Sequence, residues 1–127
     1  AYELGAVAQW LANGGSYGVH EFISQATFDA LLPEDLNTRY PGIDENEGIG
    51  MHWMWRDHRP GAQAGSTRAE DLIFSRRTIG HGSLSACILR VDLDRELIVV
   101  QVRREAGPRH GEWADRFFLA IVDNLEP

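Results

Sequence analysis

The sequence predicts an α+β protein: an antiparallel sheet packed by N-terminal helices and by a C-terminal amphipathic helix. Two apolar runs that flank a short turn, Leu84–Val91 and Leu97–Val102, are typical of a β-hairpin. The first and last segments, Tyr2–Asn13 and Gly111–Leu125, have the apolar spacing of helices instead. Because the chain has 127 residues and neither repeats nor linker-like tracts, we expect one unit over residues 1–127.

The first helix is expected over Tyr2–Asn13 and to end at Gly14-Gly15, since glycine accepts the left-handed conformation found at helix C-termini. Its apolar residues recur at helical spacing: Leu4, Val7, Ala8 and Leu11. No Ser, Thr, Asp or Asn ahead of Tyr2 can cap the free backbone N–H groups, which is expected either of a helix cut at its N-terminal end or of a frayed terminus.

A second helix is predicted to begin at Ser24, a good N-cap residue, with Ile23 packing against Phe28 across the cap. Pro33 is expected to stop this helix. Residues 33–47 are polar, acidic and rich in turn residues, so a surface loop is predicted there. They lack the ligand spacing of a calcium loop.

The middle of the chain predicts further strands. Gly48–Arg56 alternates in the manner of a strand, with Met51, Trp53 and Trp55 facing one way. Residues 57–70 have no periodicity and indicate a loop, after which Leu72–Thr78 is expected to form another strand. The hairpin runs are apolar at odd and even positions, which indicates a central hairpin covered on both faces.

The last helix has one broad apolar stripe, expected to lie against the hairpin. The stripe comprises Trp113, Phe117, Phe118, Ile121, Val122 and Leu125.

Composition excludes several functions. The chain carries a net charge of −7, which disfavours binding to nucleic acid. No apolar run approaches the roughly 20 residues that a membrane-spanning helix needs. All 12 basic residues are Arg, so a Schiff base, a Ser–Lys dyad or a Walker A phosphate grip cannot be completed within this sequence. The single Cys87 excludes an internal disulfide and is expected to be a buried, inert thiol within a strand.

The most suggestive stretch is Thr78–Ser85, where small residues surround His81 just before a strand. Small residues let a ligand approach the backbone, and a free N–H beside a histidine can bind an acyl oxygen and a carboxylate. The alternative is a glycine-rich bend with a surface histidine. A metal centre at His52, Asp57 and His58 is not expected, because no further ligands complete a coordination shell.

Five segments, taken in order, share a pattern with one known family. Gln9–Gly18 ends a helix with Asn-Gly-Gly, and Phe22–Thr27 opens the next helix. Gly48–Trp53 is a glycine-flanked strand, Gly80–Ser83 reads Gly-His-Gly-Ser, and Ile88–Val100 places Val-Asp before a turn. Together they resemble the C-terminal part of the serine β-lactamase-like (penicillin-binding-protein-like) family, which includes class C β-lactamases, D,D-peptidases and related esterases. The implied fold is a partial β-lactamase/transpeptidase-like fold.

The resemblance implies roles for individual residues. In that family a Lys- or His-containing motif on a strand binds the substrate carboxylate, and the strand backbone pairs with the acyl group. His81, Gly82 and Ser83 match this motif, so they are expected to bind substrate, with the backbone N–H of Leu84 in the oxyanion hole. Ser83 and Ala86 stand where glycine is usual.

The family's other two motifs, Ser-x-x-Lys and Tyr-x-Asn, do not occur in the sequence. The resemblance therefore implies a missing N-terminal half that carries the nucleophile, so no catalytic set is complete here and the chain alone is not expected to be active. The implied activity is hydrolysis of a small-molecule amide, ester or lactam through an acyl-enzyme, with no metal or organic cofactor.

Two other interpretations stay open. One is a non-catalytic binding or interaction module that retains the fold, and the other is a small stand-alone α+β domain. The hydrolase interpretation predicts an apolar face left open for the missing half, through which the isolated chain could dimerise. The sequence shows no charged-then-apolar leader, so a signal peptide is expected to be absent or already removed, and the compartment, cytoplasmic or exported, stays open.

Overall fold

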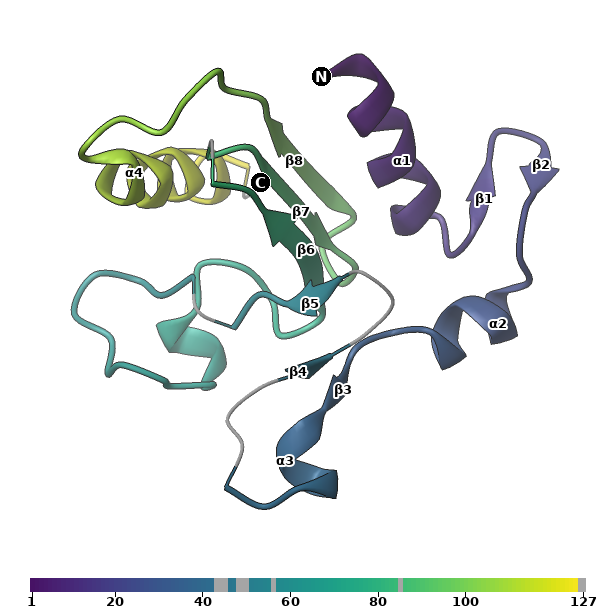
Figure 1. Ribbon diagram of the computed structural model, residues 1–127, viewed down its shortest axis with the longest axis horizontal. Helices are drawn as coiled ribbons and strands as arrows, with labels where there is room; N and C mark the ends of the chain where they lie inside the picture. Colours follow the sequence, from purple (N-terminus) through teal and green to yellow (C-terminus); the bar gives the residue numbers. More distant parts are fainter. Residues whose placement is uncertain (43–45, 48–50, 56, 85, 126–127) are drawn as a thin grey trace.

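A four-stranded antiparallel sheet with a helix on each face forms the body of the structure, a computed structural model that describes residues 1–42, 46–47, 51–55, 57–84 and 86–125 (Figure 1). The strands lie in the order β5 (His52–Trp53), β6 (Thr78–Gly82), β7 (Ile88–Asp92) and β8 (Leu97–Gln101). The mixed helix and sheet content confirms the predicted α+β class.

The central hairpin is confirmed, although its first strand is shorter than predicted. β7 pairs with β8 in the register Arg90↔Val99, and every residue of β7 is buried. Successive side chains of a strand point to opposite faces. Leu89 therefore joins the core beneath the first helix, and Ile88 joins the core on the other face.

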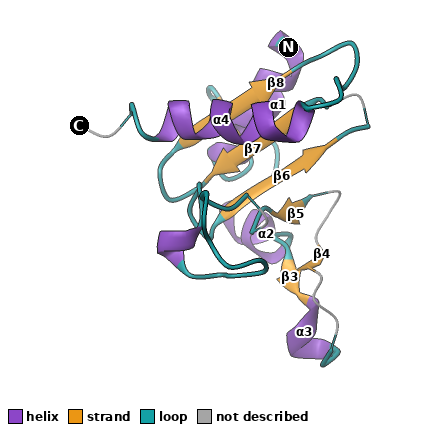
Figure 2. Cartoon of the chain, turned by 90° about the vertical axis from the view of Figure 1, so that its left-hand side faces the viewer, coloured by secondary structure: helices purple, strands orange, loops and turns teal. Residues whose placement is uncertain are grey.

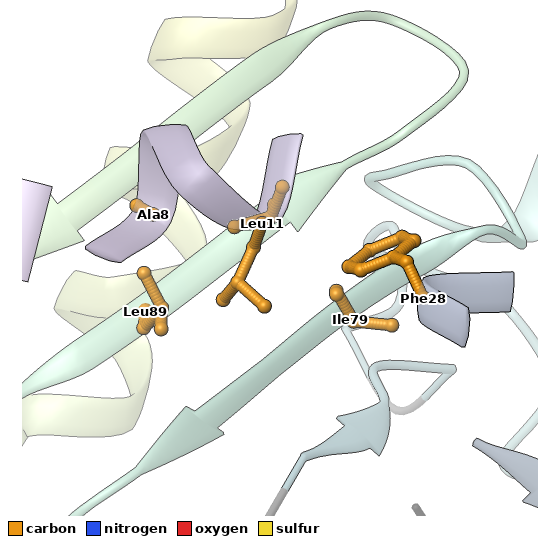
Figure 3. Close-up of a cluster of buried hydrophobic side chains, with 6 residues drawn as sticks. Ala8, Leu11, Phe28, Ile79 and Leu89 are labelled. Carbon is orange, nitrogen blue, oxygen red and sulfur yellow. The ribbon is translucent and has the colours of Figure 1, made fainter. Parts of the chain in front are cut away.

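Helix α1 (Tyr2–Ala12) covers one face of the sheet, as Figure 3 shows. Its Ala8 and Leu11 meet Leu89 of β7, while Ile79 of β6 packs with Phe28 nearby. The helix ends at Ala12 with Asn13 as its C-cap, and Gly14 follows with a φ of 61°, as the Gly-Gly pair predicts.

Helix α4 (His110–Val122) covers the opposite face, and Figure 2 shows it on the other side of the sheet from α1. Phe118 and Val122 are buried there against Ile88 and Val99. The predicted apolar stripe is only partly used, because Trp113, Phe117 and Leu125 are exposed. The guanidinium carbons of Arg109 and Arg116 lie over the Trp113 ring instead, 5.3 and 5.4 Å from its centroid.

The segment after α1 contains a short hairpin, β1 (Ser16–Tyr17) and β2 (His20–Glu21), followed by α2 (Gln25–Ala30). The Ser24 hydroxyl accepts a hydrogen bond from the Thr27 N–H at 3.2 Å, which confirms the predicted N-cap. Buried Phe28 and half-buried Ile23 share one core cluster.

Residues 33–47 are not the featureless loop that their polarity predicts. They form β3 (Glu34–Asp35), α3 (Leu36–Arg39) and β4 (Asn46–Glu47), which project below the main sheet in Figure 1. Helix α3 has its own N-cap, because the Asp35 carboxylate accepts a hydrogen bond from the Asn37 N–H at 3.0 Å. Local capping of this kind specifies a turn of helix without any apolar periodicity.

The predicted strand over Leu72–Thr78 is wrong, because the strand begins only at Thr78. Ile73 and Phe74 are buried beneath α4 in an irregular segment, so their apolar character reflects packing and not strand pairing. The predicted strand over Gly48–Arg56 is seen only as β5, and residues 48–50 and 56 lie outside the described part. Trp53 and Trp55 stack with their ring planes 2° apart.

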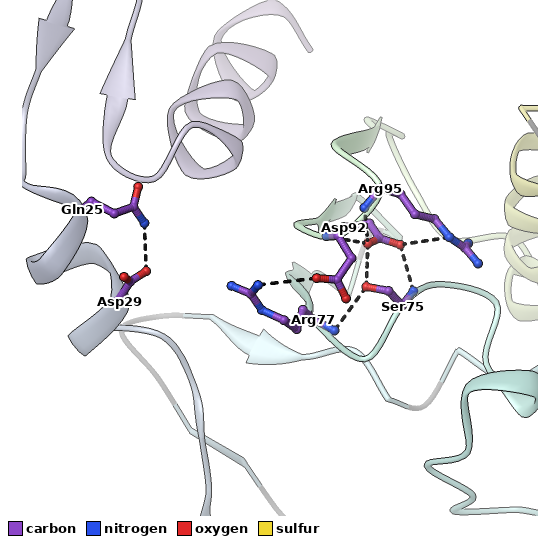
Figure 4. Close-up of polar contacts among 7 residues, drawn as sticks. Gln25, Asp29, Ser75, Arg77, Asp92 and Arg95 are labelled. Atoms are coloured by element: carbon purple, nitrogen blue, oxygen red, sulfur yellow. Dashed lines mark hydrogen bonds and ion pairs between the residues drawn. The ribbon is translucent and has the colours of Figure 1, made fainter.

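The turn between β7 and β8 is organised by the fully buried carboxylate of Asp92, as Figure 4 shows. Its two oxygens accept from the Ser75 N–H at 2.8 Å, the Ser75 hydroxyl at 2.6 Å, and the N–H groups of Asp94 and Arg95 at 3.2 Å. Asp92 therefore ties the hairpin turn to the segment that leads into β6.

Candidate functional site

Strand β6 carries the sequence Thr78-Ile79-Gly80-His81-Gly82, which we predicted as a glycine-rich approach to a strand. It is itself a strand, paired along its whole length with β7 in the register Gly80↔Arg90. Its first three residues are buried, and His81 and Gly82 are exposed. The candidate motif therefore occupies the exposed end of a strand whose other end is fixed in the core.

Backbone directions along β6 can be assigned from the hydrogen bonds at its two ends. The Thr78 carbonyl accepts from Met54 N–H at 2.9 Å on the β5 side, and Ser83 N–H donates to the Cys87 carbonyl at 3.0 Å on the β7 side. Alternate residues of an antiparallel strand face alternate neighbours, so the N–H and C=O of Gly82 point to the β5 side. The described part of β5 begins at His52, opposite Gly80, and residues 48–50 lie outside the described part of the chain.

Gly80 is required by close packing between β6 and β7. A Cβ at this position would lie 2.2 Å from the carbonyl oxygen of Leu89, whereas at Gly82 the nearest atom would be 3.9 Å away. The absence of a side chain at Gly80 thus lets the two strands approach, while the space at Gly82 is open.

His81 is exposed and lies beside a second histidine. The centroids of the His81 and His52 rings are 5.8 Å apart, with the planes tilted by 38°. The sequence suggests His52 only as a metal ligand, because spacing along the chain does not show which histidines of different strands lie side by side. The structure instead places two imidazole rings at the end of β6.

Ser83 and Leu84 follow the strand in a tight turn. Ser83 accepts two hydrogen bonds, from Ala86 N–H to its carbonyl at 2.9 Å and from Cys87 N–H to its hydroxyl at 3.2 Å. The Leu84 side chain is fully exposed, and Ala86 has a φ of 61°, a conformation that favours glycine. Ser83 and Leu84 therefore lie beyond the extended strand.

Cys87 is not the buried strand residue that we predicted. It precedes β7 and is half-buried. Its Sγ lies 3.4 Å from both the backbone N and the backbone O of Arg103.

A buried ion pair lies beneath this motif. The guanidinium of Arg90 donates to the two carboxylate oxygens of Asp57, from Nε at 2.5 Å and from Nη2 at 3.2 Å. Burial and the negative charge of Asp57 raise the pKa of the nearby Asp115 carboxyl above its ordinary value. Sequence reasoning missed Arg90, although a charged residue inside an apolar strand signals a buried partner.

Of the three residues considered for a metal, His52 lies beside His81, and the other two have different partners. Asp57 pairs with Arg90, and the His58 ring contacts the Ser66 carbonyl at 2.8 Å. The Ser66 hydroxyl in turn donates to Asp71, so His58 helps to close the loop that follows it. Among the residues that the structure describes, no group of three or more His, Cys, Asp or Glu side chains could hold a metal ion.

A shallow apolar groove of about 390 Å³ lies between α1 and the β1–β2 hairpin. It is lined by Ala6, Val7, Trp10, Tyr17 and Phe22. Phe22 and Val7 are 66% and 47% exposed, so the groove leaves apolar side chains open to solvent.

Comparison with protein-family models, curated proteins and solved structures finds no match. None of the helices in the described ranges is long and apolar enough to cross a membrane.

Proposed function

We propose that this chain is the C-terminal segment of a serine hydrolase of the β-lactamase-like family, of the β-lactamase, D,D-peptidase or esterase type. In this proposal β6 is the substrate-binding strand, and the backbone that follows it supplies part of the oxyanion hole. The nucleophile comes from a Ser-x-x-Lys motif outside the printed sequence. Its hydroxyl attacks the carbonyl carbon of an amide, ester or lactam, and the leaving nitrogen or oxygen takes a proton as the acyl-enzyme forms.

The observation that carries the proposal is the position of His81 and Gly82 at the exposed end of an otherwise buried strand. The N–H and C=O of Gly82 point away from β7, so an extended acyl group can pair with them as an added strand would. The His81 imidazole stands beside this edge and can donate a hydrogen bond to a substrate carboxylate.

Two further features support the proposal. The sheet is covered by α1 on one face and by α4 on the other, so only the strand ends and edges are available to a substrate. The apolar groove beside Trp10 and Phe22 fits the expectation of a surface that another part of the same protein covers. In this proposal the nucleophile lies on the covering part and the substrate-binding strand on this one.

The second candidate is a non-catalytic binding module with the same fold, and the turn after β6 favours it. Ser83 is folded into hydrogen bonds with Cys87, and Leu84, the expected oxyanion donor, follows it in the turn. In this alternative the Gly82 edge binds an extended peptide or acyl group without cleaving it.

Covalent labelling separates the two candidates. The full product of the natural gene is incubated with a fluorescent penicillin, and the labelled protein is detected by gel fluorescence and by the added mass. The hydrolase proposal predicts labelling that His81→Ala slows by about tenfold or more, by analogy with the loss of other substrate-positioning donors. His20→Ala, which removes an exposed histidine of β2, is the matched control and should label normally. Stoichiometric binding of the penicillin without a mass increase would favour the binding module.

A further inference from the structure

The buried pair of Asp57 and Arg90 is the least expected feature of the fold. Both side chains are about nine-tenths buried, and the Phe118 ring lies 5.4 Å from the guanidinium carbon. A buried ion pair commonly contributes little net stability, because the loss of hydration offsets the attraction between the charges. The clearer consequence of this ion pair is that it holds the Arg90 guanidinium in one position.

Arg90 has one nitrogen that Asp57 does not occupy, and this nitrogen reaches β6. Its Nη1 donates to the carbonyl oxygens of His81 at 3.3 Å and of Leu89 at 3.0 Å. His81 and Leu89 are register partners in the β6–β7 ladder, so the guanidinium spans the two strands at the candidate motif. Gly80, which has no room for a Cβ, keeps the strands close enough for this contact.

The carbonyl of His81 and the N–H of Gly82 belong to the same planar peptide group. Because the group is trans, its N–H points away from its C=O, that is, toward the β5 side of β6, and Gly82 itself is exposed. A positively charged donor on the carbonyl draws electron density toward the oxygen and leaves the N–H more positive. Hydrogen bonds in a chain strengthen one another in this way.

We infer that Arg90, oriented by Asp57, is a positioning residue that fixes the His81–Gly82 peptide group and strengthens the Gly82 N–H as a donor to a bound acyl group. The inference rests on the proposed function for its consequence in catalysis. Its structural half, the polarised peptide group, can be tested without any substrate.

The structural test measures the chemical shifts of the His81 carbonyl carbon and the Gly82 amide proton in the 127-residue chain. Loss of the charged donor in Arg90→Met, or of its orientation in Asp57→Asn, should shift both resonances upfield, and Arg90→Lys should give a smaller shift. Arg77→Met is the matched control, because it breaks an exposed pair with Asp94 at 3.5 Å and should leave both resonances in place. Folded variants at Arg90 with unchanged resonances would overturn the inference. Should Arg90→Met not fold, Arg90→Lys replaces it, and unchanged resonances in that variant overturn the inference equally.

The catalytic consequence is measured on the full natural gene product with the fluorescent penicillin. Arg90→Lys should slow acylation at saturating penicillin by about three- to tenfold, a modest factor because the donor is weakened and not removed. The half-saturating concentration should change little. An acylation rate equal to that of the parent would refute the positioning role while leaving the hydrolase proposal intact. Shifted resonances in the 127-residue chain, together with a full gene product that no penicillin labels, would refute the hydrolase proposal alone.

Discussion

Asp92→Asn tests whether a single buried carboxylate holds the turn between β7 and β8 against the segment that precedes β6. The substitution keeps the size of the side chain and replaces one acceptor oxygen with an NH2 group. One carboxylate oxygen accepts from the Ser75 hydroxyl and from the N–H groups of Asp94 and Arg95, and the other accepts from the Ser75 N–H. An asparagine can satisfy the first set only by aiming its NH2 at the Ser75 N–H.

The cost follows from these contacts. Two donors then face each other at a site where Asp92 has no exposed surface, so the Ser75 N–H loses its acceptor. An unsatisfied buried donor costs about 1–3 kcal/mol, and the three remaining bonds weaken because their acceptor is no longer charged. We expect a total loss of about 2–4 kcal/mol, a large part of the roughly 5–15 kcal/mol that stabilises a typical domain.

Urea denaturation followed by tryptophan fluorescence measures this loss as a lower midpoint at an unchanged slope. Asp94→Asn is the matched control, because Asp94 is half exposed and its side chain contacts only Arg77 at 3.5 Å among the contacts described. It should cost less than about 0.5 kcal/mol. Equal losses in the two variants, or a loss below about 0.5 kcal/mol for Asp92→Asn, would show that the buried network does not hold the turn.

Two more pairs of variants test the strand and the surface charges. Gly80→Ala should destabilise the fold by about 1–3 kcal/mol because its Cβ meets the backbone of β7 at 2.2 Å, whereas Gly82→Ala should cost less than about 1 kcal/mol; equal urea midpoints would contradict the packing argument. Asp115→Asn should slightly stabilise the protein at pH 7, because burial and the charge of Asp57 raise the Asp115 pKa, and the gain should fade as the pH falls through that raised pKa. Asp71→Asn should do the opposite, because hydrogen bonds from its neighbours lower the Asp71 pKa, so its stabilisation is complete at pH 7 and is lost as the pH falls through the lowered value. Urea midpoints are measured from about pH 7 to about pH 3 for Asp115→Asn and Asp71→Asn. Midpoints that move in the same direction for the two variants would contradict the opposite pKa shifts assigned to Asp115 and Asp71.

The elements predicted correctly are those whose signal is local. The end of α1 at Gly14, the Ser24 cap and the β7–β8 hairpin each depend on a few neighbouring residues. The strand β6 could not be found in this way, because two of its five residues are glycine, which has a low intrinsic preference for strands. Its conformation is imposed by pairing with β7. The opposite error arises at Ile73 and Phe74, whose apolar character predicts a strand. They are buried, yet they lie outside the described strands.

The candidate site was predicted only in part. His81 stands out among small residues, but its neighbour His52 comes from another strand, and pairing between strands cannot be read from spacing along the chain. Arg90 could have been noticed as a charge within an apolar run. Its partner Asp57 lies 33 residues away in an irregular segment, and only the folded chain brings the two together.

The measurement that tests the central claim most directly is the intact mass of the natural gene product, determined together with the sequence of the upstream reading frame. The hydrolase proposal predicts a longer product whose upstream part carries Ser-x-x-Lys and Tyr-x-Asn motifs. It also predicts that this product gains the mass of one penicillin on labelling. A natural product that begins at Ala1, or an upstream frame without either motif, would contradict the proposal, and His81 would then be a histidine at a strand end with no role in acyl transfer.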